Sequence, residues 1–230
     1  MQYTVFHANK GLLYTIKKLI VNPGKTAREF IDGNRVNHYK PILLVFVLSG
    51  VSTFISFKIL YFQKILTAYF DAKKMNSGFT TNYMSFMSSY STLIMLVMIP
   101  FFAMTTKLAY RKWGHNFYEH IVMNAYVVSV YTIFNILILY PLMFIFKNGS
   151  PVVLFEISQY SILAVPVVLF WFFKGFYSGK DIGSIVGRTF LILLYTIIGY
   201  ILIILLLGLV AFLIALIFGP EAVSFLKLKK

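Results

Sequence analysis

Two histidines and a glutamate form a compact group of titratable side chains. His115, Glu119 and His120 lie within six residues, just before a long uncharged segment. On a helix, the spacing of four between His115 and Glu119 places both side chains on one face, where they could ligate a metal ion. A third or fourth ligand is not evident. We therefore favour an interfacial polar cluster in which Glu119 pairs with Arg111 or Lys112, and metal binding stays open as the alternative.

Two further acidic residues lie next to apolar segments. Glu156 begins one such segment, and Asp181 lies in a connection between Lys174 and Arg188. Acidic groups within a membrane can carry protons or ions. Because both residues are near segment ends, where water is available, we expect a solvated or ion-paired role rather than transport.

Catalytic signatures are absent from the sequence. It contains no HExxH, no GxSxG and no glycine-rich phosphate loop, and its seven acidic residues are widely spread. It contains no cysteine, which excludes thiolate zinc sites and cysteine nucleophiles within these 230 residues. The sequence predicts a protein that is not an enzyme and holds no metal or cofactor, apart from the alternative of a metal ion at His115 and Glu119.

The elements that position these residues are long apolar segments. The chain is 59% hydrophobic and 12% charged, with a mean hydropathy of +0.80, and a membrane-spanning helix needs about 20 mostly apolar residues. We predict an all-α, polytopic transmembrane helical bundle of about five spans. The uncharged runs are Pro41–Phe57, Met75–Thr106, Ile121–Phe146, Ile157–Phe173 and Thr189–Pro220. The last run is long enough for either one steep crossing or a re-entrant turn, and both remain open.

Basic residues predict the orientation. Thirteen of the 21 lysines and arginines fall in residues 1–40, 107–112 and 174–188, which five spans place on one side. Cytoplasmic loops are enriched in such residues, so we predict a cytoplasmic N-terminus in a bacterial cell membrane. Attraction to anionic lipid explains the net charge of +14 without nucleic acid. The lysine-rich end of the chain also favours the cytoplasm, so an even number of crossings stays open.

Three regions follow: residues 1–40 as a cytoplasmic amphipathic segment, 41–220 as the transmembrane domain and 221–230 as a basic tail. Apolar residues recur every three or four positions in Gly11–Val21, which predicts a short amphipathic helix. A break at Asn22–Gly24 precedes Thr26-Ala27-Arg28-Glu29, which predicts a capping box and a second short helix. Both helices are expected to lie in the membrane interface.

Basic side chains of this segment are predicted to bind lipid headgroups, each contributing about 1 kcal/mol against anionic lipid. They are Lys17, Lys18, Lys25, Arg28 and Arg35. The alternative, which remains open, is an elbow that only anchors the first span. Further along, residues 63–89 read as a long loop that could serve as a docking or lid element.

The stretch from Val5 to Pro41 resembles the opening of an uncharacterised family of bacterial membrane proteins, domain of unknown function 3667. The resemblance rests on Gly11-Leu12-Leu13-Tyr14-Thr15, Pro23-Gly24-Lys25-Thr26, Arg28-Glu29-Phe30, Gly33-Asn34-Arg35-Val36 and Lys40-Pro41. It implies a membrane fold and a cytoplasmic-membrane location, and it implies no known reaction. Members of that family commonly carry a cysteine-rich zinc ribbon before this stretch, which this sequence lacks.

Two functions of different classes are compatible with these patterns. The first is a non-catalytic scaffold or accessory subunit that engages anionic lipids and either a membrane-protein partner or a second copy of itself. The second is a small transporter or lipid-handling protein with a cavity beside Pro100 and Pro166, since prolines inside spans usually kink them. The scarcity of charge within the spans favours the first.

Overall fold

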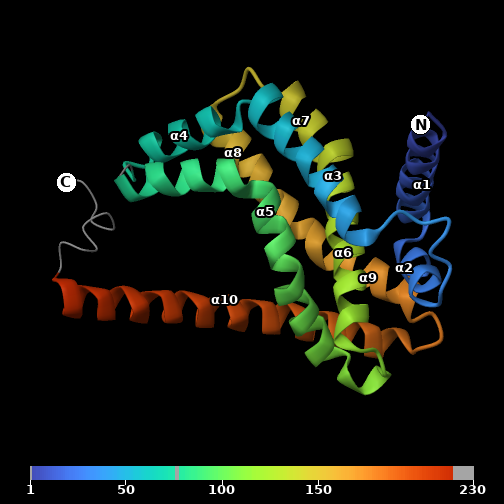
Figure 1. Cartoon of the computed structure of the whole chain (residues 1–230). Helices are drawn as coiled ribbons and strands as arrows, with labels where there is room; N and C mark the ends of the chain where they lie inside the picture. The colour runs from blue at the N-terminus through green and yellow to red at the C-terminus, as the bar shows by residue number, and fades with distance from the viewer. Residues whose placement is uncertain (1, 76–77, 220–230) are drawn as a thin grey trace.

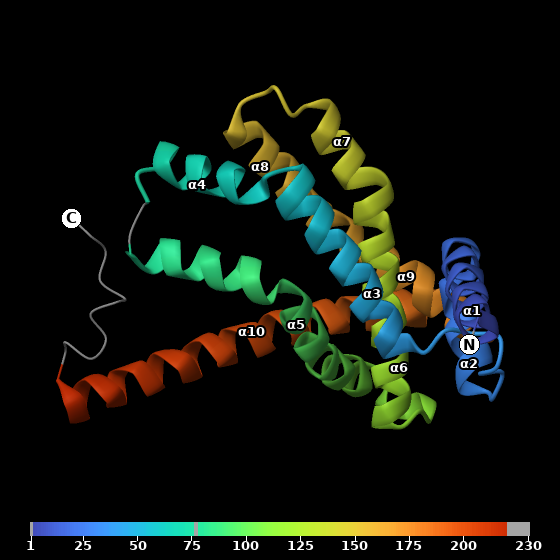
Figure 2. The same ribbon diagram turned by 45° about the horizontal axis from the view of Figure 1, so that its top comes forward.

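The computed structural model describes residues 2–75 and 78–219, and every regular element in that part of the chain is helical. Two helices precede the spans, α1 (Gln2–Val21) and α2 (Pro23–Ile31). Figure 1 shows α1 above α2 at one edge of the molecule, and Figure 2 shows the end of α10 at the opposite edge. Helix α1 and the C-terminal end of α10 therefore lie far apart.

Five helical segments in the described residues are long and apolar enough to cross a membrane. This confirms the predicted all-α polytopic fold. Three of the five are composite, because a π-helical or 3₁₀ turn interrupts or extends the α-helix. The segments are α3 (Pro41–Phe54) with η1 (Ile55–Ile59); α5 (Gly78–Ala109); α6 (Phe117–Phe134) with η3 (Asn135–Leu139) and α7 (Tyr140–Ile145); α8 (Pro151–Tyr160) with η4 (Ser161–Leu163) and α9 (Ala164–Phe176); and α10 (Ile182–Phe218).

The central element is α6, which packs against α2, α3, α5 and α9. Pro100 and Pro166, which lie inside spans, coincide with departures from straight α-helix. Pro100 lies in α5, which bends along its length in Figure 1, and Pro166 follows the 3₁₀ turn η4. A proline removes one backbone hydrogen bond and its ring crowds the preceding turn, which explains both irregularities.

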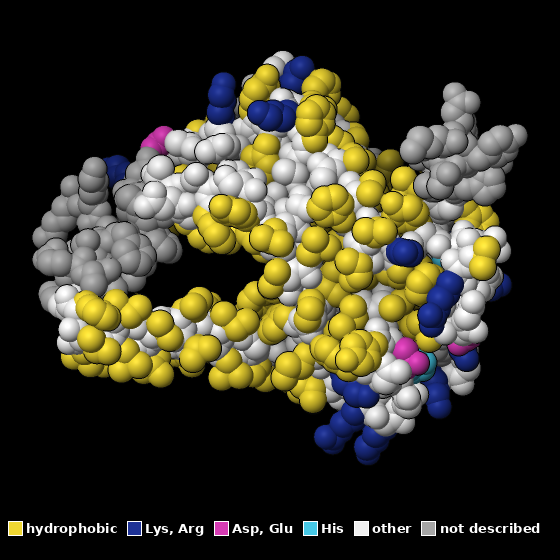
Figure 3. All heavy atoms as spheres, in the orientation of Figure 1, with side chains coloured by type: hydrophobic (Ala, Val, Ile, Leu, Met, Phe, Trp, Pro, Cys, Tyr) yellow, Lys and Arg dark blue, Asp and Glu magenta, His cyan; other side chains and the backbone are white. Residues whose placement is uncertain are grey.

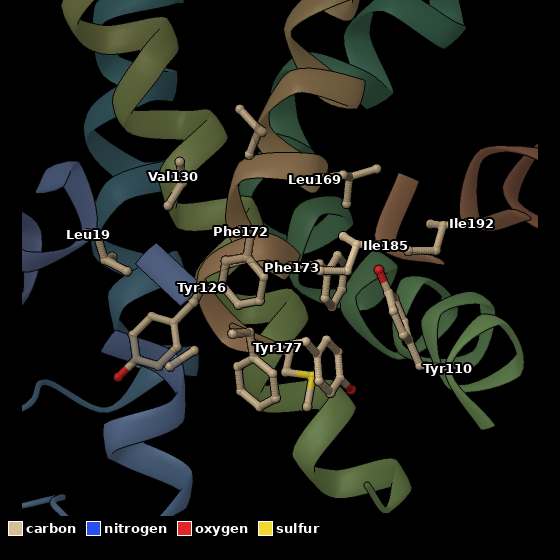
Figure 4. Packing of buried hydrophobic residues seen from close by; sticks show 14 of the residues in the cluster. Leu19, Tyr110, Tyr126, Val130, Leu169, Phe172, Phe173, Tyr177, Ile185 and Ile192 are labelled. Atoms are coloured by element: carbon tan, nitrogen blue, oxygen red, sulfur yellow. The ribbon is translucent and has the colours of Figure 1, made fainter. Parts of the chain in front are cut away.

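Aromatic rings form the core at the end of the bundle where α5 and α9 finish. Tyr110, Phe172 and Phe173 are fully buried, and the rings of Tyr110 and Tyr177 stack with centroids 4.9 Å apart. Figure 4 shows these rings filling the space between α5, α6 and α9. Within lipid such packing is stabilised by close fit, because lipid tails are as apolar as the rings.

The predicted loop over residues 63–89 is wrong where the structure describes it. Helix α4 (Phe62–Ala72) and the first turns of α5 occupy this region. Helix α4 packs on α8, where Ile65 and Leu154 are buried and the rings of Tyr69 and Phe155 lie 4.0 Å apart. Tertiary contact with an element some 90 residues later stabilises a helix that local composition does not reveal.

The predicted capping box at Thr26 and Glu29 is also wrong. The N-cap of α2 is Asn22, whose side chain accepts a hydrogen bond from the backbone N–H of Lys25. Helix α2 therefore begins at Pro23, a favoured residue for the first helical position. The break in the chain is at Asn22 alone.

The last span is one continuous helix, so the re-entrant alternative is wrong for the described residues. None of the most apolar window of α10 is buried. Phe101 lies against Gly199 and its ring is 5.3 Å from that of Tyr200, and beyond this point α10 diverges from α5. Figure 3 shows an opening between the two. The predicted basic tail, residues 221–230, lies outside the described residues.

Candidate functional site

A close backbone contact joins α2 to α9. A Cβ on Gly24 would lie 2.0 Å from the carbonyl oxygen of Phe172 and 2.2 Å from the backbone nitrogen of Phe176, so only glycine fits. Gly175 faces it, because a Cβ there would lie 3.3 Å from the Cα of Gly24. Arg28 adds a hydrogen bond of 3.1 Å from Nη1 to the carbonyl of Phe176. Two segments about 150 residues apart are thereby held in fixed register.

A polar cavity of about 680 Å³ lies beside this contact. Three basic side chains and one indole ring lie in its wall, along with two carboxylates. The lining residues are Asn22, Lys25, Arg28, Glu29, Asp32, Trp171, Lys174, Gly175 and Ser178. We call it the basic cavity.

The carboxylates of the basic cavity already have cationic or titratable neighbours. Arg28 Nε lies 3.6 Å from Asp32 Oδ2, and the buried His38 places Nε2 3.3 Å from Glu29 Oε2. Among the described side chains, Lys25 and Lys174 have no carboxylate within ion-pair distance. Lys174 Nζ lies 5.9 Å from the centroid of the Phe170 ring on the same helix. The cavity therefore presents two ammonium groups without a carboxylate partner, which suit an anionic ligand.

The structure separates the five basic residues predicted to bind headgroups. Lys25 and Arg28 line the basic cavity, whereas Lys17 and Lys18 on α1 and Arg35 after α2 do not. Lys18 lies over the ring of Tyr14 and Arg35 over the ring of Phe30. The side chains of Lys17 and Lys18 are both exposed.

Sequence reasoning missed Lys174 and Trp171 as members of the site. Both lie on the exposed face of α9, three residues apart. An aromatic residue next to a basic one at the end of a span is a general interfacial signal. Nothing in the sequence predicts that these two residues lie beside α2.

A second hollow, apolar and about 560 Å³ in volume, meets the basic cavity at Trp171. Its walls come from α1, α6, η3, α8, η4 and α9. They consist of Leu19, Ile20, Val130, Ile133, Phe134, Leu137, Ile138, Tyr160, Leu163, Ala164, Val167, Val168 and Trp171. We call it the apolar groove.

The predicted pairing of Glu119 with Arg111 or Lys112 is wrong. Glu119 Oε2 accepts a hydrogen bond of 2.7 Å from the backbone N–H of Asn116, and the Asn116 side chain accepts one from Glu119. This capping box begins α6. The Glu119 carboxylate therefore caps the N-terminus of α6. The chain turns just before this cap at Gly114, which has a φ of +91°.

The two histidines of the predicted cluster have different surroundings. His115 Nδ1 lies 3.2 Å from the hydroxyl of Tyr177, and burial lowers the pKa of its imidazole. His120 is fully buried, and its Nδ1 lies 3.1 Å from the hydroxyl of Thr106. Asn124 donates to the same hydroxyl over 2.7 Å, which links α5 to α6. No group of three metal-ligating side chains is found in the described part of the chain.

A third hollow, apolar and about 300 Å³ in volume, lies between α5, α6, α9 and α10. Residues next to both prolines line it, Met98 and Phe102 on α5 and Val165 and Val168 on α9. The polar groups of the wall belong to Asn124 and Tyr131 on α6 and to Thr196 on α10. We call it the interhelical cavity.

The five apolar spans of the described residues define a multi-pass membrane protein, and its basic side chains lie toward the ends of the bundle (Figure 3). Residues 9–53 match the model of a family described as "Protein of unknown function (DUF3667)". This confirms the predicted resemblance to that family, and the match covers most of α1, all of α2 and most of α3. Comparisons with curated proteins and with solved structures gave no match.

Proposed function

We propose that this chain is a non-catalytic scaffold or accessory subunit of a bacterial cell membrane, with the α2 end on the cytoplasmic side. There it engages anionic lipid and a membrane-protein partner or a second copy of itself. The observation that carries the proposal is the basic cavity, where Lys25 and Lys174 lack carboxylate partners beside Arg28.

The proposed orientation is supported by the distribution of charge over the described helix ends. Lys107, Arg111, Lys112, Lys174, Lys180 and Arg188 all lie at the end of the bundle where α2 packs. Segments rich in lysine and arginine are retained in the cytoplasm during insertion. The same charges attract the anionic cytoplasmic leaflet.

Native mass spectrometry of the protein released gently from its own membrane tests this function. We expect a stoichiometric protein partner, or a dimer, together with anionic lipid. Neutralising Lys25, Arg28 and Arg35 should reduce the lipid retained, whereas Asn124→Ala with Thr196→Val should leave the assembly unchanged. A protein that is monomeric and free of partners throughout would contradict the scaffold role.

The interhelical cavity favours a second candidate, a small transporter or lipid-handling protein. This cavity lies beside Pro100 and Pro166, as that hypothesis requires. The test uses proteoliposomes and a fluorescent phosphatidylglycerol whose passage between leaflets is followed by dithionite quenching. Passage that is faster than in empty liposomes and is lost with Asn124→Ala and Thr196→Val would support this candidate over the first.

A further inference from the structure

We propose that one anionic glycerophospholipid binds along α9, with its phosphate in the basic cavity and one acyl chain in the apolar groove. The inference rests on the proposed engagement of anionic lipid and goes beyond it, because it assigns a discrete site with a stoichiometry of one. Trp171 is the residue that joins the two halves, since it lines both.

One exposed face of α9 changes from apolar to cationic over its length. Val167, Trp171 and Lys174 follow one another at intervals of four and three residues, and Ser178 comes in the turn after α9; all four are exposed. Such intervals place the first three side chains on one face of the helix, and the seven-residue interval from Val167 to Lys174 spans about 10 Å. The order of chemistry along this face is that of a phospholipid, from chain through interface to headgroup.

The cationic half supplies phosphate ligands that are already in place. Arg28 is fixed by the carbonyl of Phe176 and by Asp32. The ammonium groups of Lys25 and Lys174 have no carboxylate partner among the described side chains, and that of Lys174 lies over the ring of Phe170. Ammonium groups bind phosphate oxygens through charge-assisted hydrogen bonds. An indole prefers the boundary between headgroups and hydrocarbon, which is the level of Trp171 in this arrangement.

The apolar half provides a furrow rather than a plain helix surface. Helix α1 contributes Leu19 and Ile20 at one end, and η3 contributes Leu137 and Ile138 further along. Its volume of about 560 Å³ lies in the range of small-molecule sites, about 300–1,000 Å³. A soluble anion would use only the basic cavity, so the groove is the part that selects a lipid.

The experiment is native mass spectrometry of the purified full chain titrated with phosphatidylglycerol, phosphatidylcholine or glycerol 3-phosphate. We expect one phosphatidylglycerol to bind at least tenfold more tightly than the others and than any second copy. Lys174→Gln and Val167→Trp should each weaken that first binding about tenfold, one by removing the cation and the other by filling the groove.

Matched controls separate the site from general attraction. Lys112→Gln removes the same charge at the same end of the bundle, outside the cavity, and Leu194→Trp adds an indole to the exposed face of α10. Both should leave the first binding unchanged. Ile138→Trp fills the groove from η3 instead of α9, so it replaces Val167→Trp if that variant fails to give a monodisperse, helical protein.

Three results would overturn the inference. Glycerol 3-phosphate binding as tightly as the lipid would make the cavity a phosphate site. Several equivalent phosphatidylglycerol adducts, weakened as much by Lys112→Gln as by Lys174→Gln, would leave only surface attraction, and the proposed function would stand without the site. Equal binding of phosphatidylcholine would overturn both the site and the proposed engagement of anionic lipid.

Discussion

At the scale of single residues, the hydroxyl of Thr106 connects two spans. It contacts His120 Nδ1 and accepts from Asn124 Nδ2, both on α6. We expect Thr106→Val, which keeps the shape and removes the oxygen, to lower the free energy of unfolding by about 1–2 kcal/mol. Titration with sodium dodecyl sulfate in mixed micelles, followed by circular dichroism, measures this change.

The control is Thr132→Val. Thr132 is equally buried, but its hydroxyl donates only to the carbonyl of Val128 in the same helix. Its removal leaves no donor without a partner, so the loss should be smaller. If the two variants lose the same free energy of unfolding, the hydrogen bonds between α5 and α6 do not stabilise the protein.

His115 predicts a dependence of stability on pH. Burial lowers the pKa of this imidazole below its ordinary value of 6.5, and the carboxylate of Glu119 offsets only part of that. Below pH 6.5 the unfolded chain takes up a proton that the folded chain resists. Stability contributed at this site is therefore complete at neutral pH and falls as the pH decreases through 6.5 and below.

The measurement is the difference between wild type and His115→Asn in melting temperature from pH 7.5 to pH 5. We expect the wild type to lose more stability on acidification than the variant. Parallel curves would mean that other groups cause the whole acid response. Subtracting the melting temperature of the variant from that of the wild type at each pH removes the contributions of titratable groups that both chains share.

At the scale of elements, the contact of α2 with α9 depends on Gly24. We expect Gly24→Ala to destabilise the protein by about 3 kcal/mol, the upper end for an added methyl group, because the clashing atoms are backbone atoms that cannot rotate away. Hydrogen–deuterium exchange over residues 22–32 should rise as α2 separates from α9. Gly11→Ala is the matched control.

Gly11 lies in α1, where an added Cβ would meet nothing within 4 Å. Alanine is the better helix former by about 1 kcal/mol, so this variant should be neutral or slightly more stable. If both variants behave alike, helix propensity rather than the close approach determines the role of Gly24.

Hydropathy predicts those elements whose environment is lipid, and it fails where the partner is another helix. All five spans follow from uncharged runs, because the bilayer requires a minimum apolar length of each. Helix α4 does not follow from hydropathy, because Ile65 and Tyr69 pack against α8 rather than facing lipid or water. Local sequence likewise predicts that Lys25 and Arg28 bind headgroups. It does not predict that Lys174 and Trp171 lie beside them, because that depends on the contact between α2 and α9.

At the scale of the whole molecule, the odd number of crossings predicts opposite sides for the two ends of the described chain. The absence of cysteine offers a clean background for labelling. In whole cells, Lys112→Cys should resist a membrane-impermeant maleimide and react after lysis, whereas Lys64→Cys before α5 should react at once. Labelling of both in whole cells, or the reverse pattern, would contradict the proposed orientation.

The contact of α2 with α9 also has a consequence for synthesis. Arg28 and its acceptor Phe176 are 148 residues apart, so α2 leaves the ribosome about 7–30 s before its docking surface exists, at typical elongation rates of 5–20 residues per second. During that interval four spans must insert while α2 waits. The segment that is translated first is thus among the last to reach its native contacts, and a ribosome-bound chain that stops before α9 should still expose α2 to protease.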